Sequence, residues 1–363
     1  MVRVRVKTNW RHAVLAVTAT LAAAVANAGS AGERTSERGA DSLAMEPAMS
    51  GLRIQIDNDL FAGGERDRDY TGGFALSLSG TDARDRYLSL DPVLAAIDAL
   101  TTPVEDVATR HARQVGLMVF TPRDVLSSAP VQDDRPYASL LFSTNSRVRV
   151  DNDDRGAWVS SFTVGVVGLS LTEGLHGAVH DVVGSERPRG YEHQISAGGE
   201  PTARYTLARQ YLVVAHPTSE LDVKATVQGS VGYLTETSAA VSMRFGRIET
   251  PWWSFAPELT DYIAAPMPID VRKARAEMYL FAGLRLKARA YNAFLQGQFR
   301  ESTVRYSFEE IEPIVAEAWL GVVTQIFEQT QVSYTLNYQT AELKRGPANR
   351  EALWGAVQLS HSF

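Results

Sequence analysis

Most of the chain alternates between apolar and polar residues, in stretches of about eight to thirteen residues. In residues 221–233 the apolar or small residues occupy every odd position from Leu221 to Tyr233, and in residues 332–339 Val332 to Tyr338 alternate with polar residues in the same way. Successive side chains of a β-strand point to opposite faces, so each run predicts a strand with one apolar face. A soluble sandwich also alternates. These runs, however, match the ~9–11 residues of a membrane-spanning strand rather than the ~5–6 of an average soluble strand.

Thirteen such runs can be marked along the sequence, and an even number is expected for a bacterial barrel. The weakest run, 290–299, is interpreted as a loop, which leaves twelve strands. The runs are 51–58, 72–80, 112–120, 137–150, 157–168, 202–214, 221–233, 237–247, 275–288, 290–299, 315–327, 331–341 and 351–363. An open sheet edge cannot exist in lipid. The pattern therefore predicts an all-β fold: a closed antiparallel outer-membrane β-barrel of twelve strands over residues 51–363.

Both ends of the sequence support export to the outer membrane. Four basic residues (Arg3, Arg5, Lys7 and Arg11) precede an apolar run and an Ala-Asn-Ala site, so residues 1–28 are predicted to be a signal peptide. Its removal would lower the formal net charge from −6 to −10. Residues 29–50 have no periodicity and are predicted to be a disordered lead-in. The last run ends on Phe363, which is typical of barrels recognised by the assembly machinery of the outer membrane.

Composition excludes several functions. Without any Cys, the chain has no disulfides, Cys-ligated zinc or thiol nucleophile. The net charge of −6 argues against nucleic acid as a partner. Apart from the apolar run of the predicted signal peptide, the sequence contains no run long enough to predict a membrane-spanning helix. There is also no Gly-x-Ser-x-Gly motif and no dinucleotide fingerprint.

Two connections between strands are expected to contain helices. Residues 91–100, with a Pro at position 92, predict a short helix within a periplasmic connection at 81–110, where it would plug or cap the barrel mouth. Residues 173–183 predict a second helix, in an extracellular loop at 169–200.

Polar residues at the end of the first predicted strand form one candidate site. Ile54 and Ile56 define the lipid-facing side, so Asn58 has lipid-facing parity. Asn58, Asp59 and the acidic residues within 65–71 supply the oxygen ligands that hard cations prefer. The alternative is an ordinary outer loop with common turn-forming residues.

A second candidate site lies in the extracellular loop. Glu173, His176 and His180 fall on one face of the predicted helix, and Glu186 follows it. This arrangement is compatible with catalysis or metal binding. A surface helix with incidental histidines is the alternative.

Four motifs in order give the chain a resemblance to the outer-membrane lipid A 3′-O-deacylase family. They are Asn58-Asp59, Asp69-Tyr70-Thr71-Gly72-Gly73, Phe120-Thr121-Pro122 with 133–138, and the stretch from Gly165 through His180 and Glu186 to Ile195. The resemblance implies a twelve-stranded barrel with its active site between the outer wall and an extracellular helix. The family's site residues correspond to Asn58, Asp59, Thr71, His180 and Glu186. His176 stands where the family usually has Gln, and Leu169 where it usually has Pro.

The resemblance implies Ca²⁺-assisted hydrolysis of an ester-linked acyl chain of lipid A in lipopolysaccharide, next to outer-membrane lipids. His180 would act as general base, Glu186 would orient it, and Asn58 and Asp59 would bind the metal. Thr71 would hold substrate or a metal-bound water. His176 would be a polar substrate-site residue, bind metal, or mark an altered activity. Counting from Phe74 gives Thr71 the wrong parity for the lipid face, so a bulge at Gly72-Gly73 is expected. The alternatives are a phospholipid esterase and a non-enzymatic barrel, either a pore or a structural protein.

Overall fold

A computed structural model describes residues 45–363, except 64–67, 104–107, 184–185, 216–219 and 270–275. All of them belong to one compact unit, Arg38–Phe363. The predicted signal peptide and residues 29–44 of the lead-in lie outside the described residues. The prediction of disorder is wrong for residues 45–50, because Pro47 accepts a hydrogen bond from Thr81 and Ser50 donates one to Ser79. Local composition did not indicate these backbone partners.

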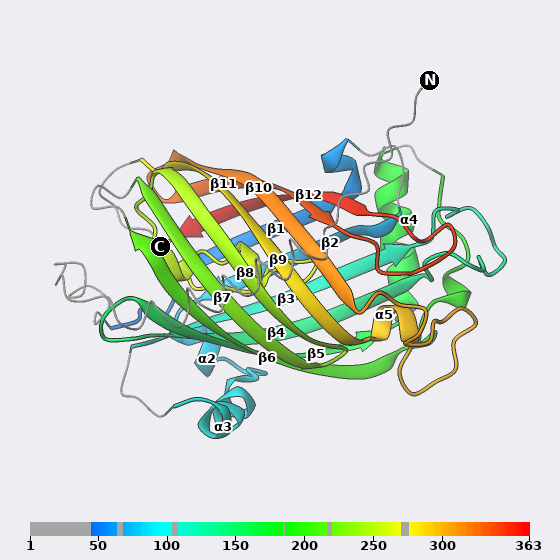
Figure 1. Ribbon diagram of the computed structural model, residues 1–363, viewed down its shortest axis with the longest axis horizontal. Coiled ribbons are helices and arrows are strands. Elements are labelled where there is room, and N and C mark those ends of the chain that lie inside the picture. Colours follow the sequence, from blue (N-terminus) through cyan, green and yellow to red (C-terminus); the bar gives the residue numbers. More distant parts are fainter. Residues whose placement is uncertain (1–44, 64–67, 104–107, 184–185, 216–219, 270–275) are drawn as a thin grey trace. The chain divides into compact units, whose positions relative to one another are not determined.

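The described residues form twelve antiparallel strands that close into a barrel, as predicted (Figure 1). Closure is made by β1 and β12, with Gly51 opposite Ser362 and Asn58 opposite Gly355. Residues 290–292 finish β9 and 293–296 form the short helix α5, so the weak run at 290–299 is indeed no separate strand. The strands are β1 Gly51–Asn58, β2 Asp69–Ser79, β3 Thr109–Thr121, β4 Ala138–Val150, β5 Gly156–Val167, β6 Glu200–Ala215, β7 Leu221–Gly232, β8 Leu234–Arg247, β9 Met278–Asn292, β10 Ile314–Phe327, β11 Thr330–Gln339 and β12 Ala352–Ser362.

Side chains alternate between the lumen and the outer wall. In β9, Arg285 and Lys287 are buried in the lumen, whereas Leu280 and Leu284 are exposed on the outside. In β1, Gln55 and Asp57 are buried and hydrogen-bonded to each other inside, and Ile56 is exposed. Asn58 therefore has the outward direction that its parity predicted.

The lumen is occupied by the connection between β8 and β9, a feature that the sequence pattern did not predict. Within it, η4 (Trp252–Ser254) and η5 (Pro257–Leu259) lie inside the wall, and Trp252 and Trp253 pack with inward residues of β4, β5 and β6. Glu258 accepts hydrogen bonds from Gln210 at 2.6 Å and from Ser242 at 3.0 Å. Wall residues thus hold this segment, 248–269, in place.

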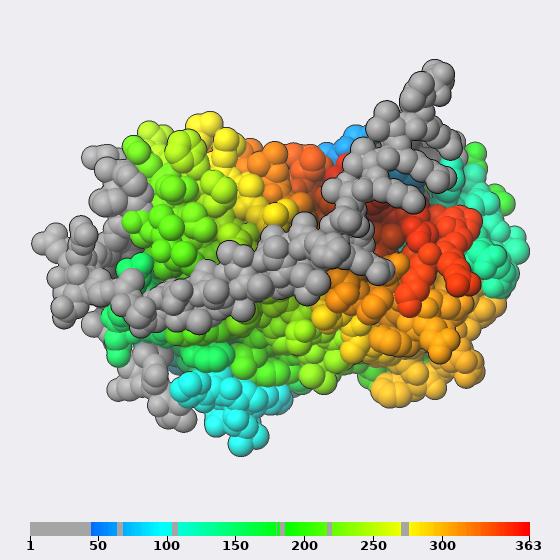
Figure 2. All heavy atoms as spheres, in the orientation of Figure 1, coloured from blue at the N-terminus to red at the C-terminus, as the bar shows by residue number. Residues whose placement is uncertain are grey.

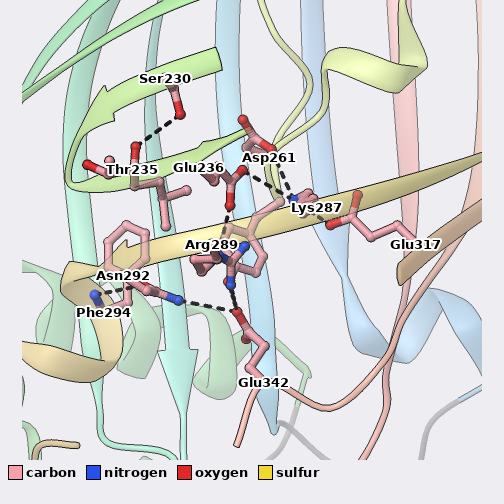
Figure 3. Close-up of polar contacts among 12 residues, drawn as sticks. Ser230, Thr235, Glu236, Asp261, Lys287, Arg289, Asn292, Phe294, Glu317 and Glu342 are labelled. Atoms are coloured by element: carbon pink, nitrogen blue, oxygen red, sulfur yellow. Dashed lines mark hydrogen bonds and ion pairs between the residues drawn. The ribbon is translucent and has the colours of Figure 1, made fainter. Parts of the chain in front are cut away.

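A network of buried charges surrounds the same segment (Figure 3). Lys287 of β9 lies 3.1 Å from Asp261 and also pairs with Glu317 of β10. Arg289 donates to Glu236 of β8 at 2.7 Å and pairs with Glu342, which belongs to the connection before β12. Buried charges are tolerated when each one is paired. The network therefore joins the lumen segment to the wall and, through Glu342, to the connection between β11 and β12.

The helices occupy connections at both ends. At the end where Gly51 and Ser362 lie, α2 (Thr81–Asp85) and α3 (Asp91–Thr101) follow β2, confirming the predicted helix at 91–100. At the opposite end are η2 (Asp59–Ala62), α4 (Leu171–Val183), which confirms the helix expected over 173–183, and η3 (Tyr191–His193). No helix in the described part of the chain has the length and apolar character needed to cross a membrane.

The placement of α3 differs from the prediction. It packs against β4 and β5 through residues that face away from the lumen, and Figure 1 shows it beside the barrel rather than across its mouth. The prediction that the helix at 81–110 plugs or caps the barrel mouth was therefore wrong. The lumen is filled by residues 248–269 instead, and α3 covers the outside of the wall.

Candidate functional site

The end of β1 is built so that a polar side chain can lie on the outer face. Asn58 pairs with two glycines, Gly72 of β2 and Gly355 of β12, so neither partner on the adjacent strands places a side chain beside it. Its Oδ1 accepts a hydrogen bond from the Leu60 backbone at 2.8 Å, which caps η2, and its Nδ2 donates to the Thr71 carbonyl at 3.1 Å. A Cβ at Gly355 would lie 2.6 Å from Cβ of Phe61. The glycine therefore lets η2 fold back over the outer wall.

Thr71 owes its position to a bulge. The register between β2 and β3 shifts between Tyr70 and Gly72, so Thr71 is the extra residue. Tyr70 is buried in the lumen cluster, and a Cβ at Gly73 would lie 2.4 Å from the Tyr70 hydroxyl, so both face inward. The two residues between them face outward. The expected bulge is confirmed, one residue before the predicted Gly72-Gly73.

The Thr71 hydroxyl lies 2.6 Å from the Thr121 hydroxyl, and both residues are buried. Thr121 ends β3 on its outer face, because the preceding Phe120 packs in the lumen. The structure therefore brings Asn58, Thr71 and Thr121 together on the outer wall. Sequence reasoning did not single out Thr121, although it lies in the Phe120-Thr121-Pro122 motif.

The end of β1 offers oxygen donors of the type that Ca²⁺ prefers, but few of them are carboxylates. Asp59 is buried beside Asn58, and its Oδ2 accepts a hydrogen bond from the Arg68 backbone at 3.0 Å. Among the described residues, no three His, Asp or Glu side chains lie together in a way that would bind a metal ion. An amide, one carboxylate, hydroxyls and main-chain carbonyls fit a hard cation that keeps part of its water shell, and do not fit a transition metal.

The predicted pair of histidines comes together on α4. His176 and His180 are one turn apart and both buried, with ring centroids 4.5 Å apart at nearly a right angle. His180 Nδ1 lies 2.6 Å from the Glu186 main-chain oxygen. A carbonyl only accepts hydrogen bonds, so this contact requires the proton on Nδ1 and leaves the lone pair of neutral His180 on Nε2.

Glu186 contacts His180, as expected, but through its main chain. Its carboxylate is exposed, and it contacts His180 through the main-chain oxygen. The contact between Glu186 and His180 is therefore made by the backbone after α4. A carbonyl oxygen is available at every residue, so residue identity could not have predicted this contact.

His176 is held by a residue that sequence reasoning missed. Its Nδ1 lies 2.7 Å from the hydroxyl of Tyr191 in η3. Burial, with a smaller contribution from the charge of neighbouring His180, lowers the pKa of His176 from 6.5 to about 3. His176 is therefore neutral near pH 7 and acts as a polar, hydrogen-bonding side chain, as the Gln usual at this position in the resembling family would.

Tyr191 also connects the two halves of the site. Its ring packs with Tyr137 and with Val119, which faces outward from β3. Val119 and Thr121 are successive residues on that face, about 6.8 Å apart along the strand. The His176–Tyr191 pair and the Thr71–Thr121 pair are thus neighbours on the same outer surface. Glu173, by contrast, is exposed on the first turn of α4.

Taken together, these features define a class of protein. The chain is an outer-membrane β-barrel, with a cluster of histidine, threonine and asparagine side chains on its outer wall, at the end opposite Gly51 and Ser362. In such barrels the longer loops lie on the extracellular side. The cluster lies at the end that carries the long connections 122–137, 168–199 and 293–313, so we take this end as the extracellular one.

Comparisons with known proteins agree with this class. Residues 14–363 match the family model described as outer membrane protein LpxR, so the chain belongs to the LpxR family and is located in the outer membrane. Its fold is similar to that of LpxR from Salmonella typhimurium, with a TM-score of 0.67, 16% identity, and coverage of 86% of this chain and 100% of that one. The β domain of the Bordetella autotransporter BrkA matches with a TM-score of 0.42, 10% identity, and coverage of 87% and 100%. No curated protein sequence gives a significant match.

Proposed function

We propose that this LpxR-family protein is an ester hydrolase that removes an acyl chain from lipid A in the outer leaflet of the outer membrane. The observation that carries the proposal is the position of His180. It lies on α4, which is joined through His176 and Tyr191 to the outer face of the wall at Val119. Family membership and the ordered motifs support lipid A as the substrate.

In the proposed reaction His180 is the general base. Its Nε2 accepts a proton from water as the water oxygen bonds to the ester carbonyl carbon. The bond from that carbon to the alcohol oxygen then breaks, and the departing oxygen takes the proton back from His180. The products are a free fatty acid and lipid A with one hydroxyl uncovered. The hydrogen bond to the Glu186 carbonyl keeps the base in the required tautomer.

The remaining residues position the ester. Asn58 and the paired hydroxyls of Thr71 and Thr121 provide polar groups beside the wall, where the ester would otherwise meet only apolar side chains. Neutral His176 and Tyr191 form the other side of this polar region. Each group is already hydrogen-bonded in place, which reduces the cost of ordering it when substrate binds.

We also propose that Ca²⁺ assists the reaction, bound by Asn58 and Asp59 with Thr71 nearby. When bound, Ca²⁺ would polarise the ester carbonyl and offset the repulsion between anionic lipid A and this acidic protein. With a single carboxylate among these donors, we expect weak, readily reversible binding.

One structural observation weighs against a passive pore as the alternative. Residues 248–269 occupy the lumen and are held there by buried hydrogen bonds such as Gln210 to Glu258. A phospholipid esterase would use the same groups, so only the choice of substrate separates it from a lipid A deacylase.

The test is mass spectrometry of lipid A after incubation with the purified barrel, with Ca²⁺ or with EDTA. A parallel assay measures fatty acid released from phosphatidylethanolamine vesicles. The proposal predicts loss of acyl mass from lipid A with Ca²⁺ only. Fatty acid release from phospholipid alone would instead support the esterase, and activity in EDTA would reject the metal.

A further inference from the structure

The outer wall carries an unusual group of polar residues near its periplasmic end. Val148 and Val150 of β4 face the lumen, where they pack with Trp252, so Asn145, Arg147 and Arg149 face outward. On β5, Ala157 and Val159 face the lumen in the same way, and Ser160 faces outward. In a membrane barrel this surface would normally be apolar or lie beyond the lipid.

The segment from α2 to α3 satisfies these outward groups. Arg147 donates to Asp91, the first residue of α3, at 2.7 Å between Nε and Oδ1. Asn145 donates to the Ala83 carbonyl at 2.8 Å. Asp98, two turns along α3, accepts from Ser160 at 2.7 Å and from Tyr205 of β6 at 3.0 Å. The polar wall is therefore matched by a polar helix face.

The opposite face of α3 is apolar, which is the reverse of a helix on a soluble protein. Asp91, Leu94 and Asp98 are buried against the wall, whereas Leu100 is 88% exposed and Val93 is 47% exposed. The remaining positions that are not buried are Pro92, Ala95, Ala96, Ile97, Ala99 and Thr101. Within the helix, both charged residues are buried against the wall, and every aliphatic residue except Leu94 is at least partly exposed.

The apolar face of α3 continues the lipid-facing surface of the barrel. Val115 of β3 and Leu141 of β4 are exposed on the outer wall farther along the strands that carry Arg113 and Asn145. The loop before α3 adds the exposed side chains of Tyr87 and Leu88. Figure 2 shows the segment projecting from the outside of the barrel. Tyrosine at the edge of such a surface is typical of a membrane interface.

From these observations we infer that α3 lies in the periplasmic leaflet of the outer membrane, with its apolar face against phospholipid acyl chains and its acidic face against the wall. The occupant of this surface is lipid, because the surface joins the barrel's own lipid-facing side and the protein is located in the outer membrane. A helix of this kind lies in the membrane plane rather than crossing it. It replaces lipid over Asn145, Arg147 and Ser160, so the wall can remain polar there. This inference does not depend on the proposed enzymatic activity.

Because the chain contains no Cys, single cysteines can be introduced and spin-labelled selectively. The test variants are Leu100→Cys and Val93→Cys on the exposed face of α3. Leu284→Cys, on the outer face of β9, is the control for lipid, and Arg345→Cys, in the exposed loop before β12, is the control for water. In phospholipid vesicles, collision rates with oxygen, which concentrates in lipid, and with a nickel chelate, which stays in water, are measured by electron paramagnetic resonance. The shift of the folded barrel on unheated gels confirms that each variant is folded.

We expect labels at positions 100 and 93 to resemble Leu284→Cys, with high oxygen and low nickel accessibility. Nickel accessibility like that of Arg345→Cys would overturn the inference and place α3 in the periplasm. Spin–spin broadening between labels on different molecules would also overturn it, because the apolar face would then contact a second copy of the chain.

Discussion

Replacing Thr71 with valine tests whether its hydroxyl is part of the site or only part of the bulge. Valine keeps the shape of threonine but removes the hydroxyl that lies 2.6 Å from that of Thr121. Thr71 is 3% exposed and Thr121 is fully buried, so the Thr121 hydroxyl loses this partner away from water. Leaving a buried polar group unsatisfied costs about 1–3 kcal/mol. The free energy of unfolding in urea, measured in lipid vesicles, should fall by that amount.

The double variant Thr71→Val with Thr121→Val separates structure from function. Replacing both partners with apolar groups of the same shape is nearly neutral, so stability should largely recover. Deacylation should not recover, because the hydroxyl that positions the ester is still missing. Wild-type activity in the double variant would refute a role for Thr71 in substrate positioning. Wild-type stability in the single variant would refute the contact itself.

Two further predictions follow from other contacts. His176 has a folded pKa of about 3, below its ordinary 6.5, so it stabilises the fold fully above pH 6.5 and this contribution is lost as pH falls toward 3. Between pH 6.5 and pH 5, the free energy of unfolding should fall by up to about 2 kcal/mol less in His176→Gln than in wild type, at 1.36 kcal/mol per pKa unit. The measurement is urea unfolding of both proteins at both pH values. Equal decreases would contradict the burial of a neutral ring. Glu258→Ala removes the acceptor of Gln210, Thr226 and Ser242 and the partner of Lys224, so the lumen segment should loosen and planar bilayers should show ion conductance absent from wild type. Indistinguishable conductance would mean that Glu258 does not hold the segment in place.

The sequence was most informative where a local pattern reflects a local environment. Alternation predicts the strands because each side chain meets either lipid or the lumen, and this distinction also predicted the outward direction of Asn58. The spacing of His176 and His180 predicts their contact, because α-helix geometry places residues four apart on one face. These features need no knowledge of distant parts of the chain.

Other features depend on partners far away in the sequence. The lumen segment is held by Glu258, whose partners lie on three different strands, and a run of Trp, Pro and Ala residues does not reveal them. Tyr191 and Thr121 enter the site only because the fold places their strands and loops side by side. The sequence indicates one part of the arrangement of α3: Asp91 and Asp98 are seven residues apart and therefore lie on one face of the helix. Which face meets the wall depends on Arg147 and Ser160.

We propose that His180 acts on lipid A at the outer wall, and the most direct test is the mass of lipid A from cells producing His180→Gln. His193→Gln is the matched control, because His193 lies in the same loop and its Nε2 contacts the Ser128 carbonyl instead of the histidine pair. We predict that wild type and His193→Gln yield lipid A lacking an acyl chain, whereas His180→Gln, folded and present at equal levels, yields unmodified lipid A. Deacylated lipid A from the His180→Gln cells would contradict the account.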